Sequence, residues 1–199
     1  MAKENKQKYH HGDLRTALIN ATIEMINQQG VSSITMRNLS EWVGVSRTAA
    51  YRHFDDKSAL LTATAIEGFR QFSEALRVAR LDESKDEITR FRMMGQAYIN
   101  FAIENAAYYR LMFGDTVIQE NEKLRATCDD AFRELLMIIE LLQEVKAICC
   151  DDPKNQAIYI WSLMHGLSSL VIDNKLQADV ELKELMVFID HQIHKSLSD

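Results

Sequence analysis

The chain has 199 residues but contains only one proline, seven glycines and three cysteines. So little proline and glycine leaves little room for long disordered segments. Cys128, Cys149 and Cys150 are too few and too irregularly placed to form a disulfide framework. A reducing compartment is the simplest interpretation. Within it, these cysteines either pack in the core and loops, or the adjacent pair at 149–150 forms a redox switch.

Long apolar runs are also missing. Unbroken apolar stretches reach five residues, as in Leu135–Ile139, whereas a membrane-spanning helix needs about 20. The first thirteen residues, MAKENKQKYHHGD, are polar and lack the apolar stretch of a secretory signal. We therefore expect a cytoplasmic protein with no membrane partner.

Apolar residues nevertheless make up 47% of the chain, which is enough for a substantial core. Most of the sequence shows helical spacing and few strand signals; Leu14, Leu18, Ala21 and Met25, for example, fall on one helical face. We expect an all-α fold of about nine helices. Their predicted ranges are about 12–29, 36–43, 47–51, 55–80, 86–104, 106–113, 117–146, 153–173 and 180–197.

The net charge of −6 is unevenly distributed. Residues 1–60 carry eight Lys and Arg against six Asp and Glu, whereas residues 61–199 carry 15 against 23. A weakly basic first part and an acidic remainder fit a DNA-facing head on an acidic body.

The most informative segment is Gly30–Leu61, which has the pattern of a helix-turn-helix. Thr35 and Ser46 can each cap a short helix, because their hydroxyls accept hydrogen bonds from free backbone N–H groups. Gly44 suits the turn between them, because it can adopt a positive φ. The second short helix then presents a polar, basic outer face, which is typical of a helix that reads DNA.

The segments GVSSITMR, GVS, AAYRHF and DDKSALL resemble, in order and spacing, the signature of TetR-type transcriptional regulators. The resemblance implies a DNA-binding domain at 12–72, with the helix-turn-helix at about 35–54. It also implies a C-terminal ligand-binding and dimerisation domain at 81–197. The implied function is a homodimeric repressor that binds a palindromic operator and is released by a small-molecule effector. The alternative is an activator, or a protein-interaction regulator without a small-molecule inducer.

Arg47 and Thr48 begin the second short helix and are best placed for base edges, because Arg suits guanine and the Thr methyl suits thymine. The resemblance assigns Tyr51, His53 and Lys57 to phosphates. Basic residues at 1–11 form either a solvated tail or an arm in the minor groove. The full set of predicted DNA contacts is Thr35, Arg37, Ser46, Arg47, Thr48, Tyr51, Arg52, His53 and Lys57. Two alternatives remain: an ion pair for Arg37 within the head, and a core position for Tyr51.

The last two predicted helices, at about 153–173 and 180–197, are apolar over more than one face. Such a surface needs a second partner. The simplest partner is the same pair of helices in another copy, which gives a two-fold symmetric homodimer; the alternative is one intramolecular bundle. Dimerisation through the last two helices is also what the resemblance implies.

Trp161 and His165 are four residues apart and therefore share a helical face. With Gly166 they resemble the signature of a TetR subgroup with a Trp-His-Gly motif. They belong either to an aromatic core or to the wall of a pocket for an apolar or aromatic effector. The predicted pocket residues are Tyr98, Phe101, Tyr108, Met112, Trp161, Met164 and His165.

Two other kinds of site receive little support. His191 and His194 share a helical face with Asp190 nearby, but two histidines without a cysteine make a weak metal site, and we expect no cofactor. The sequence has no Gly-rich phosphate loop, HExxH motif or nucleophile elbow. We therefore expect no enzymatic activity.

Overall fold

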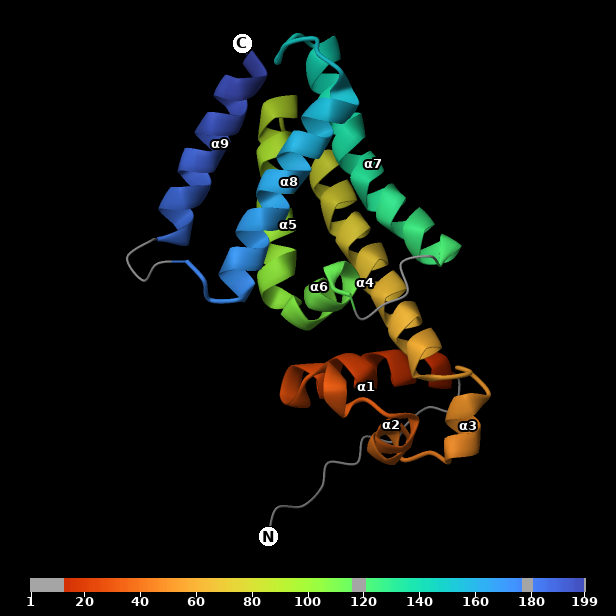
Figure 1. Cartoon of the computed structure of the whole chain (residues 1–199). Coiled ribbons are helices and arrows are strands. Elements are labelled where there is room, and N and C mark those ends of the chain that lie inside the picture. Colours follow the sequence, from red (N-terminus) through yellow and green to blue (C-terminus); the bar gives the residue numbers. More distant parts are fainter. Residues whose placement is uncertain (1–12, 116–120, 177–180, 199) are drawn as a thin grey trace. The chain divides into compact units, whose positions relative to one another are not determined.

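The computed structural model describes residues 13–115, 121–176 and 181–198 (Figure 1). All regular elements in these ranges are helical, which confirms the predicted all-α class. They are α1 (Leu14–Gln29), the short 3₁₀ helix η1 (Val31–Ser33), α2 (Met36–Val43), α3 (Arg47–Tyr51), α4 (Lys57–Arg80), α5 (Glu87–Glu104), α6 (Ala106–Phe113), α7 (Glu122–Glu144), α8 (Pro153–Ile172) and α9 (Leu182–Ser198). The predicted basic arm at 1–11, and the predicted helix starts at 12, 117 and 180, lie outside the described residues.

The chain divides into two compact units between Thr64 and Ala65, a boundary that falls inside α4. The predicted domain limits, 12–72 and 81–197, stay a prediction. In the first unit, α1, α2 and α3 pack together around a small apolar core. Its buried side chains include Leu18, Met25, Ile34, Leu39, Ala50 and Leu60.

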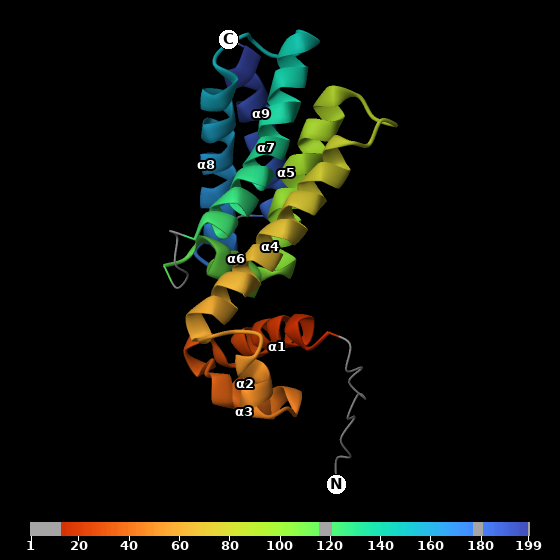
Figure 2. The ribbon, with the colours of Figure 1, turned by 90° about the vertical axis from the view of Figure 1, so that its right-hand side faces the viewer.

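In the second unit, α5, α7 and α8 run side by side and α6 packs against α5 (Figure 2). Phe72 of α4 lies at the centre of an aromatic cluster. Its ring makes edge contacts with Tyr98 of α5, at 4.8 Å between centroids, and with Trp161 of α8, at 5.8 Å. Phe72 thus joins α4, α5 and α8 in one aromatic core.

Helix α9 is attached to the second unit mainly through its C-terminal half. Ile193 and Leu197 are buried there, and the Cys149 amide donates a 2.7 Å hydrogen bond to the carbonyl oxygen of Leu197. Nearer its start, Val187 and Phe188 are exposed. The first half of α9 is therefore held less firmly than the second.

Gly68 of α4 is a point of close helix packing. A Cβ at this position would lie 2.7 Å from the Met112 sulfur and 2.8 Å from a ring carbon of Tyr108, both on α6. Only glycine leaves room for α6 at this distance.

Candidate DNA interface and ligand cavity

The geometry of the first unit is that of a helix-turn-helix. Gly44 ends α2 in the left-handed conformation, with φ +77°, and its amide and that of Val45 both donate to the Ser40 carbonyl. This turn directs the chain into α3, whose Ala50 is fully buried. One face of α3 is thereby fixed in the core, and the opposite face points to solvent.

Arg47, Thr48, Arg52 and His53 are all exposed, and the Tyr51 side chain is 50% exposed. The core alternative for Tyr51 is therefore wrong. The predicted base-reading and phosphate-binding side chains of the second short helix lie on one accessible surface. Their contacts with DNA stay a prediction.

The remaining predicted DNA contacts have partners within the protein. The hydroxyls of Thr35 and Ser46 accept hydrogen bonds at 3.0 and 3.1 Å from the amides three residues ahead, so both cap their helices. The Arg37 Nε lies 2.9 Å from a Glu41 carboxylate oxygen in an exposed pair, which confirms the ion pair within the head. Such an exposed pair is weak and leaves Arg37 able to exchange Glu41 for a phosphate.

Lys57 is half-buried at the start of α4. Its Nζ donates a 3.3 Å hydrogen bond to the carbonyl oxygen of Val31, in the turn after α1. Lys57 thus connects the start of α4 to the turn after α1 within the first unit, and it is also a candidate phosphate contact.

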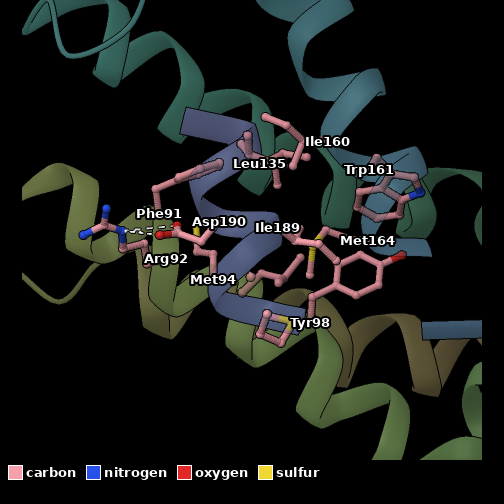
Figure 3. A pocket seen from close by; sticks show the side chains of 14 residues that line it. Phe91, Arg92, Met94, Tyr98, Leu135, Ile160, Trp161, Met164, Ile189 and Asp190 are labelled. Atoms are coloured by element: carbon pink, nitrogen blue, oxygen red, sulfur yellow. Dashed lines mark hydrogen bonds and ion pairs between the residues drawn. The ribbon is translucent and has the colours of Figure 1, made fainter. Parts of the chain in front are cut away.

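The second unit contains an apolar cavity of about 50 Å³ (Figure 3). Three predicted pocket residues, Tyr98, Trp161 and Met164, line it. The lining is completed by Leu76, Phe91, Arg92, Met94, Gly95, Leu135, Ile160, Met186, Ile189, Asp190 and Ile193.

The structure places the other four predicted pocket residues outside this cavity. Phe101 is buried against Phe72, at 5.1 Å between ring centroids. Tyr108 and Met112 pack on α4 beside Gly68. His165 lines a separate surface recess, which it shares with Tyr109 and the ion pair of Arg110 and Asp173.

Sequence reasoning missed the contribution of α9 to the cavity, because it assigned that helix to dimerisation alone. Met186, Ile189 and Ile193 follow one another at spacings of three and four and form an inward stripe. Asp190 lies beside this stripe and pairs with Arg92 of α5 at 3.0 Å, at one side of the cavity in Figure 3. The sequence signal that could have indicated this contribution is the carboxylate of Asp190 directly after Ile189 of the apolar stripe.

A chain of two hydrogen bonds, one buried and one partly buried, connects α5, α6 and α8 next to the cavity. The hydroxyl oxygens of Tyr98 and Tyr109 are 3.1 Å apart, and the Tyr109 hydroxyl lies 2.7 Å from Nδ1 of His165. Burial raises the pKa of Tyr109 to about 12, and it raises the pKa of Tyr98 further. Both phenols therefore stay protonated at neutral pH.

His165 should make stability depend on pH. Burial lowers its pKa below the usual 6.5, so below that pH the unfolded chain binds more protons than the folded one. Stability present above about pH 6.5 should therefore fall as the pH drops. Urea unfolding at pH 7.5 and 5.5 measures this fall, and His165→Gln should make it smaller. An equal fall in wild type and variant would contradict the assignment.

His191 and His194 of α9 are exposed, and Asp190 is paired with Arg92. Within the described ranges, no three His, Cys, Asp or Glu side chains are grouped so that they could hold a metal ion. Cys149 and Cys150 are both free thiols. None of the helices in those ranges has the length and apolar character needed to cross a membrane.

Comparison with known families tests the helix-turn-helix interpretation directly. Residues 18–64 match the model described as bacterial regulatory proteins of the tetR family, and residues 91–190 match a tetracyclin repressor-like C-terminal domain. The chain belongs to the TetR family. It is therefore a DNA-binding transcriptional regulator and not an enzyme, as predicted. Membership of the Trp-His-Gly subgroup stays a prediction.

Three other proteins are similar to this chain over most of its length. The nucleoid occlusion factor SlmA of Vibrio vulnificus (strain YJ016) is 33% identical over 138 residues, which cover 66% of this chain and 68% of that protein. SlmA of Shewanella sp. (strain W3-18-1) is 30% identical over 193 residues, 92% of this chain and 95% of its own. A protein of unknown function from Rhodococcus sp. RHA1 is 25% identical, with a TM-score of 0.87 over 98% of this chain and 100% of its own.

Proposed function

We propose that this TetR-family regulator acts in the cytoplasm as a homodimeric repressor. Each copy presents one α3 to a half-site of a palindromic operator, and a small molecule bound in the second unit releases the DNA. The observation that carries the proposal is the exposed apolar face of α8, because it gives the chain a surface suited to a second copy.

Tyr159, Leu163, Gly166 and Leu170 follow one another on α8 at spacings of four, three and four. The three apolar side chains are each about 40% exposed, and a Cβ added at Gly166 would meet nothing within 4 Å. Phe188 of α9 is 58% exposed. An exposed apolar stripe with a glycine at its centre suits a closely packed, two-fold symmetric helix contact.

Dimerisation gives the short α3 its specificity. One helix reads few bases, whereas two helices held about one DNA turn apart read a palindrome. Specific complexes of this kind typically reach dissociation constants of about 10⁻⁸ to 10⁻¹¹ M. Selection of bound fragments from a random DNA library tests the proposal, and it should return an inverted repeat. A selection that returns no preferred sequence would count against operator recognition.

Arg47→Ala should relax the sequence preference at one position of each half-site. A bidentate Arg–guanine contact is worth about 1–3 kcal/mol of discrimination. Operator affinity should therefore fall by roughly 10- to 100-fold for each half-site, while binding to random DNA changes little. Lys57→Ala is the counterpart: it should weaken binding to all sequences and lower the salt slope by about 1 for each half-site. An equal loss on operator and random DNA for Arg47→Ala, or a loss on the operator alone for Lys57→Ala, measured by fluorescence anisotropy, would refute these roles.

A second candidate function is a DNA-bound regulator whose output is a protein contact rather than release by a small molecule. Two observations favour it. The curated relatives at 30–33% identity are named nucleoid occlusion factors, and the cavity of about 50 Å³ is far smaller than ligand pockets of about 300–1,000 Å³. Operator binding that no component of a metabolite extract weakens would favour this candidate over the first.

A further inference from the structure

An open groove of about 770 Å³ lies between α5 and α9, next to the apolar cavity. The groove is lined by Arg92, Gln96, Ile99, Asn100, Leu182, Lys183, Met186, Val187 and Asp190. Three of these side chains, Arg92, Met186 and Asp190, also line the cavity. They form the wall between the open groove and the apolar cavity.

The two compartments differ in chemistry. Beyond the Arg92–Asp190 pair, the cavity is lined by aliphatic and aromatic side chains, by three methionines and by Gly95. Methionines are flexible and adapt to the shape of an occupant. The groove instead offers two cations, Arg92 and Lys183, against the single carboxylate of Asp190, together with two side-chain amides. Its charge complements an anion, whereas the cavity suits an apolar chain.

Two features of the dividing wall would ease its opening. The Arg92 and Asp190 side chains are 48% and 34% exposed, and ion pairs this exposed contribute little. Met186 precedes the buried anchor residues Ile193 and Leu197, so it lies in the half of α9 that is held less firmly. An outward shift of this half would join groove and cavity without breaking the anchor.

We propose that this joined space binds an amphiphile with one aliphatic chain and a carboxylate head. The chain enters between Met94, Met164 and Ile189, and the carboxylate replaces that of Asp190 on the Arg92 guanidinium. A neutral amphiphile would gain no such ion pair. A cationic one would meet Arg92 and Lys183. The role of this ligand as effector rests on the proposed function, whereas its binding does not.

The chain offers a direct reporter of cavity occupancy. It has two tryptophans, Trp42 in the first unit and Trp161 in the cavity wall. In the Trp42→Phe protein, tryptophan fluorescence, excited selectively over tyrosine, therefore comes from Trp161 alone. The probe is decanoate, used below its critical micelle concentration. Decanol and decyltrimethylammonium have the same chain and serve as neutral and cationic comparisons.

Decanoate should change the Trp161 emission saturably and bind more tightly than decanol or decyltrimethylammonium. Arg92→Gln should weaken decanoate binding roughly tenfold, since it removes a charge-assisted hydrogen bond, and should leave decanol binding unchanged. Asp190→Asn should tighten decanoate binding, because it removes the competing carboxylate. Arg133→Gln, which removes a cation from another exposed pair, with Asp130 of α7, is the matched control and should have no effect.

The proposal fails if decanoate and decanol bind alike, if Arg92→Gln has no effect, or if the Trp161 signal does not saturate. It also fails if the Arg92 and Asp190 variants change the oligomeric state without a response to decanoate, since the groove would then hold a second copy. Operator affinity is measured separately on the wild-type protein. Decanoate binding without release of DNA would leave this site standing and overturn only the effector part of the proposed function.

Discussion

Gly166→Phe should convert the protein to a monomer and lower its operator affinity by roughly 100-fold or more, the usual gain from linking two binding modules. In the single chain, the space around Gly166 is open, so the new ring should not disturb the fold. In the proposed dimer, the same ring would hold the two α8 helices apart. Sedimentation velocity measures the first effect, and anisotropy titration of a labelled operator measures the second.

Val78→Phe is the matched control for this experiment. Val78 is 60% exposed on α4, in the same unit but on another helix, so an added ring there should leave the dimer and its operator affinity unchanged. A Gly166→Phe protein that remains dimeric with full operator affinity would show that α8 does not form the dimer interface. The proposed symmetry would then be wrong.

Gly68→Ala should destabilise the protein by up to about 2 kcal/mol. Overpacking a filled site costs about 1–3 kcal/mol, and alanine recovers only about 1 kcal/mol of helix propensity. The Met112 thioether can move away from the new Cβ, but the Tyr108 ring is buried and has little room to do so. Urea unfolding followed by circular dichroism measures the change.

Gly95→Ala provides the opposite case within the same unit. The nearest atom to a Cβ at Gly95 is the terminal carbon of Met164, at 3.8 Å, which is an ordinary contact. This substitution should therefore stabilise α5 by up to about 1 kcal/mol. If both alanine variants shift stability in the same direction by similar amounts, close packing of α4 against α6 is not what requires glycine at 68.

Local signals predicted most of the helix limits. Thr35 and Ser46 cap α2 and α3 as expected, and Asp152 accepts hydrogen bonds from the amides of Lys154 and Asn155 at the start of α8. These residues succeed as predictors because a cap is satisfied by atoms two or three residues away. The local sequence is therefore enough to predict where these helices begin.

The cavity was predicted less well because it depends on contacts between distant segments. Periodicity shows that Tyr108 and Tyr109 belong to a short buried helix, but it does not show which ring faces α4 and which faces α8. The structure places Tyr108 beside Gly68 and joins Tyr109 to His165. Likewise, nothing in the local sequence pairs Arg92 with Asp190, which lies 98 residues further along.

The hydrogen bonds that join Tyr98, Tyr109 and His165 have a direction. When Nδ1 of His165 carries no hydrogen, Tyr109 donates to it and accepts from Tyr98. When Nδ1 is protonated, His165 donates instead, and Tyr109 is free to donate its own hydrogen to Tyr98. The tautomer of one partly exposed imidazole thus decides whether the hydroxyl of Tyr98, a residue that lines the cavity, donates or accepts, without any movement of the backbone.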